Sequence, residues 1–308
     1  GSFKIKHRMT PLHILLAISM AMLWGFGFVT SKYAAVHMEP LFFLALRFIA
    51  VSLLLVWFVR LPRGQLKAVM LFACSMGAGH FGLFYIALEI GVEASTASII
   101  WQSQVPLTVI LAAFLLGDRP GWVGILGIAI AFGGVLLLVG EPRHFDNGLA
   151  IGLMFASCIM WAIANIQAKK LTTVEPLALN AWMSVFSAII LLICSLIFET
   201  GQLESFLIAD WRLHGSLVYQ VVGSTVLAYW IWYFLLARYP VSRVTGYMLL
   251  VPFSGVLSGI FALGEPITWP TALGGMVTLI GVTLIVRSRQ TADSETETSP
   301  RAPTRKLG

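Results

Sequence analysis

The chain has 308 residues, of which 58% are hydrophobic and only 11% are charged, and its mean hydropathy is +0.87. Because an ordinary soluble domain carries about 25% charged residues, a chain this long and this poor in charge excludes a soluble globular enzyme and a disordered or fibrous protein. The net charge of +6 comes from basic residues between apolar runs and near the C-terminus, which favours orientation in a membrane over binding to nucleic acid.

Along the chain, apolar runs of about 20 residues follow one another, and this length spans a bilayer as a helix. A polar segment, 1–10, precedes the first run, and the segment 288–308 after the last one is predicted to be a disordered tail because it is rich in Thr, Ser and Pro. The predicted spans are 11–36, 41–60, 66–89, 95–116, 121–140, 148–168, 177–198, 214–237, 243–263 and 269–287. The sequence therefore predicts an all-α membrane protein with ten transmembrane helices.

Basic residues predict how these spans are oriented. Sixteen of the 20 Lys and Arg residues fall in the N-terminal segment, in the loops after even-numbered spans and at the C-terminal end. Since positively charged loops remain in the cytoplasm, both termini are expected there. The expected location is the plasma membrane, specifically a bacterial inner membrane, with the longest outer loop at 199–213.

The second half of the chain repeats motifs of the first half in the same order. The matched pairs are Trp24 and Trp161, Lys32 and Lys169, Glu39-Pro40-Leu41 and Glu175-Pro176-Leu177, Val105-Pro106 and Val251-Pro252, and Gly117 and Gly264. The predicted repeats are 11–140 and 148–287, joined by the linker 141–147. Since each contains an odd number of spans, the two must cross the membrane in opposite senses, an arrangement typical of transporters with a site between the repeats. The alternative is that duplication merely supplied enough helices.

The chain resembles the EamA type of the drug/metabolite transporter superfamily across nearly all of its length. The resemblance rests on Trp24-Gly25-Phe26-Gly27-Phe28 with Lys32, Ala45-Leu46-Arg47-Phe48, the Pro106 span, Gly117-Asp118-Arg119-Pro120, Gly133-Gly134-Val135 and Gly264-Glu265-Pro266. Asp118 stands where that family commonly has Glu. The resemblance implies ten helices around a central cavity and export of small metabolites, and overall it is strongest to the YddG-type aromatic amino-acid exporters.

Aromatic and amide side chains inside the spans are candidates for substrate binding. Trp and Tyr usually mark membrane interfaces, so those near mid-depth favour a cavity for flat, amphipathic molecules. The candidates are Trp24, His80, Tyr85, Trp101, Gln102, Trp161, Asn165, Tyr233 and Tyr247. His80 could also carry a proton, or it could be a core histidine bonded to a neighbouring helix. Core packing is the alternative for each aromatic residue.

Three cations inside or at the ends of spans are candidates for gating or structural roles. Arg47 could bind a carboxylate or pair with a gate residue, or it could form a structural pair with Glu39 or Glu89. Lys32 and Lys169 end the first helix of each repeat, where they could act as gate cations or extend to the lipid head groups.

No acidic residue lies in the middle of a span, and no metal-ligand cluster or nucleotide motif is apparent. The sequence therefore predicts a secondary transporter, without enzyme activity, cofactor or metal, that exports small amphipathic metabolites, amino acids including aromatic ones, by alternating access. Its expected partners are that small-molecule substrate and the lipid bilayer, with no nucleic acid and with the oligomeric state open. The alternatives are a membrane enzyme acting on lipid-like substrates and a channel.

Overall fold

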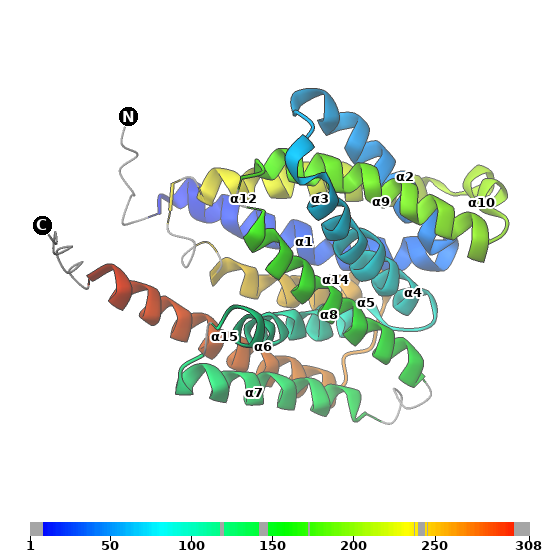
Figure 1. Ribbon diagram of the computed structural model, residues 1–308. Helices are drawn as coiled ribbons and strands as arrows, with labels where there is room; N and C mark the ends of the chain where they lie inside the picture. Colours follow the sequence, from blue (N-terminus) through cyan, green and yellow to red (C-terminus); the bar gives the residue numbers. More distant parts are fainter. Residues whose placement is uncertain are drawn as a thin grey trace, which may run out of the picture.

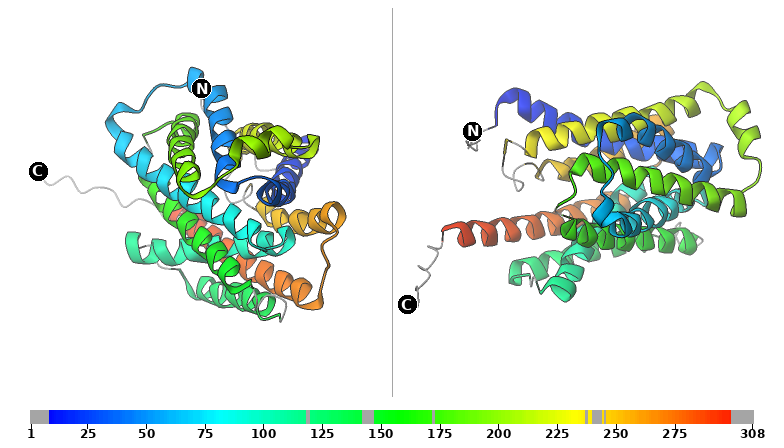
Figure 2. Two further views of the ribbon diagram at one scale, coloured as in Figure 1. Left: turned by 90° about the vertical axis from the view of Figure 1, so that its right-hand side faces the viewer. Right: turned by 45° about the horizontal axis from the view of Figure 1, so that its top comes forward.

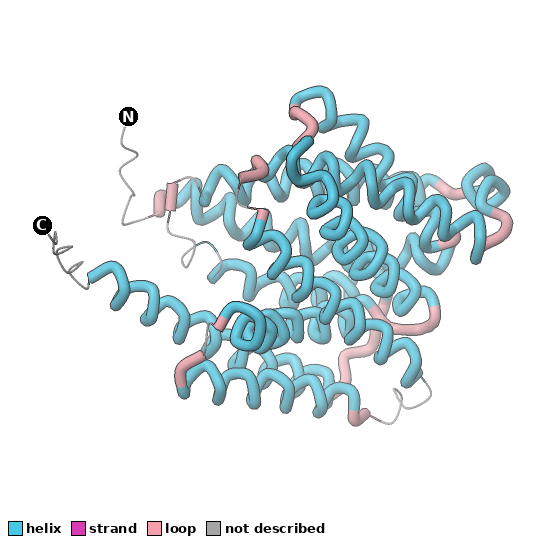
Figure 3. Tube along the Cα trace, in the orientation of Figure 1, coloured by secondary structure: helices cyan, strands magenta, loops and turns pink. Residues whose placement is uncertain are grey.

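The described residues of the computed structural model fall in helices and the loops between them (Figures 1 and 3). The structure describes residues 9–117, 120–141, 147–171, 173–236, 238–239, 244 and 246–298, without the side chains of residues 233, 236 and 289–298. The first repeat contains α1 (Pro11–His37), α2 (Pro40–Leu55), η1 (Val56–Phe58), η2 (Arg63–Gln65), α3 (Leu66–Ala73), η3 (Cys74–Gly82), α4 (Leu83–Glu89), α5 (Ala94–Ile100), η4 (Trp101–Ser103), α6 (Gln104–Leu116) and α7 (Trp122–Val139). The second contains α8 (Gly148–Lys170), α9 (Pro176–Phe198), α10 (Gln202–Ile208), α11 (Trp211–Val218), η6 (Tyr219–Leu227), α12 (Ala228–Leu236), η7 (Tyr247–Leu249), α14 (Leu250–Leu263) and α15 (Trp269–Thr298).

The helical elements confirm the predicted all-α membrane fold. Within the described residues, eight helical segments are long and apolar enough to cross a membrane, and Tyr247–Leu263 is a shorter apolar one. The remaining predicted span corresponds to the continuous helical run from α11 through η6 to α12. Many large apolar side chains face outward, such as Phe114 at 83% and Phe261 at 84% exposure, as expected where lipid rather than water surrounds the helices.

The structure adds helix to two segments outside the predicted spans. The predicted outer loop 199–213 contains the short helix α10, and α11 already begins at Trp211 with the Asp210 side chain accepting the Leu213 N–H. Of the segment 288–308, expected to be a disordered tail, residues 288–298 instead continue α15 as helix, and residues 299–308 lie outside the described residues. Gln, Ala and Glu in this stretch are good helix formers, so a helix that starts in the membrane can propagate beyond it.

The helices run roughly lengthwise, with α1 beginning and α15 ending at the same end of the molecule (Figure 1). We call this the terminal end and the opposite one the acidic end. Carboxylates connect the loops at the acidic end: Ser205 bonds to Glu39, Glu199 accepts the N–H of Leu41, and Thr268 bonds to a Glu141 oxygen. Elements far apart in sequence are therefore fastened together there.

The internal repeat is visible in where the helices lose regular α geometry. The π-helices η3 and η6 begin at Cys74 and Tyr219, which are 145 positions apart. The 3-10 turns η4 and η7 begin at Trp101 and Tyr247, which are 146 positions apart. Each 3-10 turn precedes Val-Pro, and the proline ring crowds the carbonyl four residues earlier while lacking an N–H to bond it. The duplicated prolines therefore explain the duplicated turns.

Repeat-related helices also pack against each other. In the end-on view, α7 and α15 run side by side along one edge of the molecule, and α2 lies near α9 (Figure 2). The α7–α15 pair approaches backbone to backbone, because a Cβ atom on Gly134 would lie 2.3 Å from the amide nitrogen of Thr278. Close approach at small residues is how membrane helices gain van der Waals contact.

Candidate functional site

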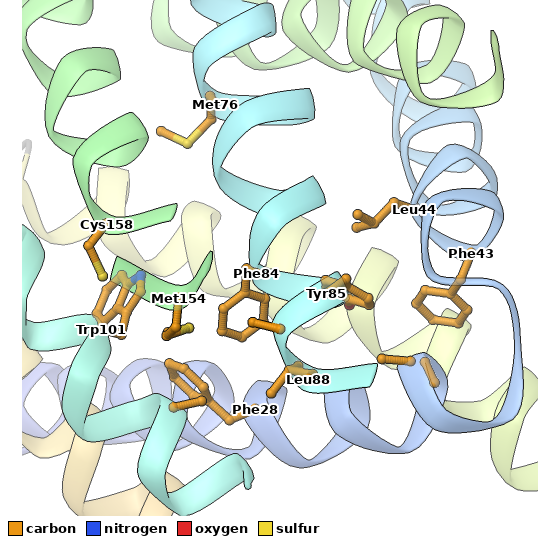
Figure 4. Close-up of a cluster of buried hydrophobic side chains, with 14 of the residues drawn as sticks. Phe28, Phe43, Leu44, Met76, Phe84, Tyr85, Leu88, Trp101, Met154 and Cys158 are labelled. Atoms are coloured by element: carbon orange, nitrogen blue, oxygen red, sulfur yellow. The ribbon is translucent and has the colours of Figure 1, made fainter. Parts of the chain in front are cut away.

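A cluster of aromatic rings surrounds His80, which is 2% exposed and belongs to the π-helix η3. Its ring centroid lies 4.6 Å from that of Trp161 and 5.9 Å from that of Phe84, and Trp161 lies 5.3 Å from Trp101. Figure 4 shows a band of rings running from Trp101 past Phe84 to Tyr85 and Phe43. The structure thus brings together four predicted site residues: His80, Trp101, Trp161 and Tyr85.

His80 is held in this cluster by α8. Its Nδ1 lies 2.9 Å from the hydroxyl of Ser157 and 3.1 Å from the carbonyl oxygen of the same residue. This is the bond to a neighbouring helix that a core histidine needs, and it leaves the opposite edge of the ring to the aromatic cluster. The bond also fixes the π-helical segment of the third span against the first helix of the second repeat.

The 3-10 turn η4 places buried polar groups without partners beside Trp101. Gln102 is 3% exposed and its Nε2 has no hydrogen-bond partner, and Ser103 is 1% exposed with a similarly unpartnered hydroxyl. A buried donor that has no hydrogen-bond partner costs about 1–3 kcal/mol. Two such groups next to Trp101 therefore indicate a place where a polar ligand atom or water would be favourable.

A second polar region joins α1 to η6, and the sequence did not identify its central residue, Gln220. Gln220 is 2% exposed, and its Nε2 donates toward the Gly27 carbonyl at 2.8 Å and toward the hydroxyls of Thr30 at 2.7 Å and Ser31 at 2.9 Å. Ser31 in turn donates to the Tyr85 hydroxyl at 2.9 Å. The sequence does contain a signal for this residue, because Gln220 is an amide inside an apolar span. Burying an amide costs free energy unless it is hydrogen-bonded.

Trp24 and Trp161 occupy equivalent positions in the repeats but different surroundings. Trp24 donates its indole N–H to the carbonyl of Ser224 at 3.0 Å and lies 5.4 Å, ring to ring, from Tyr229. It contacts the edges of both hydrophobic clusters of the protein rather than the rings around His80. Trp24 therefore belongs with the polar region at η6.

The other aromatic and amide candidates lie apart from the His80 cluster. Asn165 donates to the hydroxyl of Thr108 at 3.2 Å, which ties α8 to α6. Tyr247 is half-buried and packs against the smaller cluster formed around α12. The side chain of Tyr233 lies outside the described residues.

The two lysines that end the first helix of each repeat differ in surroundings. Lys32 is half-buried, donates to the Leu88 carbonyl at 2.6 Å, and lies within electrostatic reach of Glu265 and Glu93. Lys169 is exposed at the C-terminal end of α8, as a lysine that extends to head groups would be. The repeat symmetry does not extend to these charges.

Arg47 is 5% exposed and donates to the hydroxyl of Thr225 at 3.2 Å. Neither carboxylate that the sequence suggested as its structural partner is bonded to it in the described part of the chain. Glu39 instead accepts from Ser205, and Glu89 lies near Glu39 and Glu199 at the acidic end.

A small apolar pocket opens at the acidic end, between α2 and the helices α10 and α11. It is lined by Met38, Phe43, Phe206, Ala209, Leu213, His214 and Leu217. Because it contains none of the predicted site residues and no unpartnered polar group, we place the candidate site at the His80 cluster instead.

Comparison with known proteins identifies relatives over almost the whole chain. The model of the EamA-like transporter family matches residues 11–140 and again residues 148–287. A probable amino-acid metabolite efflux pump of Salmonella typhimurium is 31% identical over 288 residues, covering 90% of this chain and 96% of the relative. Its Escherichia coli counterpart is 30% identical, with 87% and 92% covered.

Two more distant matches are a sequence relative and a solved structure. A probable terminal-alkyne amino-acid exporter of Streptantibioticus cattleyicolor is 25% identical, with 74% of this chain and 76% of the relative covered. One crystal structure superposes with a TM-score of 0.62 at 16% identity, covering 94% of this chain and all of that one. At this identity the superposition supports the fold alone.

Proposed function

The chain belongs to the EamA-like transporter family, and from this premise we propose that it is a secondary transporter that exports small amphipathic metabolites, amino acids including aromatic ones, by alternating access. Its relatives named amino-acid metabolite efflux pumps support efflux of small molecules by a multi-pass membrane protein. The aromatic substrates and the gating mechanism are our proposal.

One observation carries the choice of substrate: an aromatic ring cluster beside unpartnered polar atoms in the interior. Trp101 contributes a ring to the cluster, and the adjacent Gln102 amide and Ser103 hydroxyl lack partners. A molecule with a flat apolar part and a polar end would stack its flat part on the ring cluster and form hydrogen bonds with the amide and the hydroxyl. Amino acids with aromatic side chains meet this description.

The paired helix breaks support alternating access. Each repeat contributes one π-helix and one 3-10 turn at equivalent places, η3 with η4 and η6 with η7. Such breaks often mark functional sites and hinges, and the broken helices of transporters border their substrate sites. Bending at one pair would open one gate, and bending at the other pair would open the opposite gate.

We predict that Trp101→Ala weakens transport of aromatic amino acids in liposomes containing the purified protein. Losing one stacking face removes about 0.5–1.5 kcal/mol, so the KM for phenylalanine should rise about 2- to 12-fold at about 1.4 kcal/mol per tenfold. Trp122→Ala is the matched control, since Trp122 is 77% exposed. Equal KM values for both variants in well-folded protein would mean that the ring cluster does not contact the transported molecule.

We also propose that the terminal end faces the cytoplasm, following the distribution of Lys and Arg. Residue 204 is exposed at the acidic end. Residue 64 is exposed in the connection between α2 and α3, on the opposite side from the acidic end, where α2 begins and α4 ends. In a variant lacking Cys74, Cys158 and Cys194, Glu204→Cys should react with a membrane-impermeant maleimide added to intact cells, whereas Gly64→Cys should react only after lysis. The opposite pattern would invert the orientation.

A further inference from the structure

The interior holds a positive charge that no carboxylate balances among the described residues. The polar neighbours of Arg47 are the hydroxyls of Thr225 and Tyr85. Its other neighbours are rings, with its guanidinium carbon 4.6 Å from the centroid of Phe81 and 5.6 Å from that of Phe48. Its Nε is buried and has no hydrogen-bond partner. The guanidinium group is thus surrounded by two neutral hydroxyls and by ring faces, and its Nε donor remains unpaired.

Such an arrangement is unfavourable in the absence of an anion. A buried ionised group costs far more than a neutral polar one unless it is paired and hydrogen-bonded. Arginine cannot escape this cost by losing its proton, and its five N–H donors form a planar fork that fits a carboxylate. Ring faces offset part of the cost, but they leave Nε unsatisfied.

Two carboxylates at the start of α2 are engaged in other contacts. Both oxygens of Glu199 accept N–H groups at the start of α2, from Leu41 at 2.8 Å and Phe42 at 3.0 Å. Glu39 binds Ser205 at the same end of the molecule. The anion that complements Arg47 is therefore best supplied from outside the chain.

Arg47 also lies where the two repeats meet the candidate site. Phe81, which it covers, belongs to the π-helix η3, and Thr225 belongs to the equivalent π-helix η6. The Phe81 ring lies 4.7 Å from that of His80, which continues to Trp161 at 4.6 Å. A cation for a carboxylate and a surface for an aromatic ring are thus connected through adjacent rings.

We propose that Arg47 binds the carboxylate of the transported molecule, so that the substrates are carboxylic acids with an apolar, ring-bearing side chain. This inference rests on the proposed export function and narrows it, since the ammonium group of an amino acid would then be dispensable. The equivalent position of the second repeat is occupied by Met183, so the pairing with an anion belongs to one repeat only.

The test compares three compounds that differ only in their charged groups: phenylalanine, 3-phenylpropionate and phenethylamine. Liposomes containing the wild-type protein should transport labelled phenylalanine, and unlabelled 3-phenylpropionate should compete with it while phenethylamine should not. Transport inhibited equally by phenethylamine would overturn the inference without touching the export function. Wild-type protein that does not transport labelled phenylalanine would overturn both.

Arg47→Met provides an independent readout, because it copies the residue of the other repeat. Without ligand, its midpoint of thermal unfolding should equal or exceed that of the wild type, since a buried charge replaced by a similar apolar group is often neutral or stabilising. Its transport of phenylalanine should fall at least tenfold. A lowered midpoint, or unchanged phenylalanine kinetics, would mark Arg47 as structural.

Thr225→Val keeps the charge but removes the hydroxyl that positions one Nη group. We expect a several-fold higher KM for phenylalanine with the preference for carboxylates retained. An unchanged KM would contradict the role of this pair at the carboxylate.

Discussion

Gly134→Ala is expected to destabilise the protein severely, although alanine is the better helix former. In an exposed helix, replacing Gly by Ala stabilises by roughly 0.5–1 kcal/mol. At Gly134 the new methyl group would lie 2.3 Å from the Thr278 nitrogen and 2.6 Å from the Gly274 carbonyl oxygen. Both atoms are backbone of α15, so the helix as a whole must move, and overpacking of this kind costs about 1–3 kcal/mol or more.

Gly133→Ala is the control, because the adjacent glycine of α7 has nothing within 4 Å of its added methyl group. Thermal unfolding in detergent, followed by intrinsic fluorescence and size-exclusion chromatography, should show a large loss for Gly134→Ala and no loss or a slight gain for Gly133→Ala. Similar midpoints for the two variants would mean that α7 and α15 are not in backbone contact.

The fold was largely predictable because span length and repeated prolines are local signals. The pairing of Val105-Pro106 with Val251-Pro252 anticipated equivalent spans, and the structure adds a 3-10 turn before each. The π-helices were not predictable, since an i→i+5 register depends on contacts with other helices. The helical extension of α15 to Thr298 is not apparent in the sequence, because the polar composition of this stretch is also typical of disorder.

The sequence predicted which residues lie in the candidate site better than it predicted which of them contact one another. Depth in the span identified His80, Trp101 and Trp161, which do cluster. Sequence could not reveal that Trp24 contacts Tyr229 instead, because the two repeats contribute different neighbours at equivalent positions. Nor could it reveal that Glu39 bonds to Ser205 rather than to Arg47, since this contact depends on which loops converge at the acidic end.

Glu265→Gln should weaken the connection between the two repeats at the acidic end. The Glu265 side chain is 9% exposed, and its two oxygens accept the N–H groups of Ala94 at 2.6 Å and Ser95 at 2.8 Å. It thereby links the loop before α15 to the first residues of α5, in the other repeat. A glutamine offers one oxygen and presents its NH2 group to the remaining donor. One buried backbone N–H then has no hydrogen-bond acceptor, which costs about 1–3 kcal/mol.

A lower midpoint of thermal unfolding for Glu265→Gln, with Glu204→Gln unchanged as the exposed control, would support this. A second variant, on another helix, should disturb the same Glu265 carboxylate. An added methyl group on Gly259 of α14 would lie 2.4 Å from Glu265 Oε2, so Gly259→Ala should displace the carboxylate and lower the midpoint too, whereas Gly152→Ala, facing open space, should not.

The double variant Gly259→Ala/Glu265→Gln distinguishes this mechanism from unrelated damage. Both changes are expected to break the hydrogen bonds to Ala94 and Ser95. Once one substitution has broken them, the other has little further effect. The loss of unfolding free energy in the double variant should therefore be smaller than the sum of the losses in the two single variants. Residues that share one contact typically show interaction energies of about 0.5–3 kcal/mol in such cycles. Fully additive losses would mean that Gly259→Ala destabilises α14 for another reason, and that the carboxylate is not what holds the start of α5 to the second repeat.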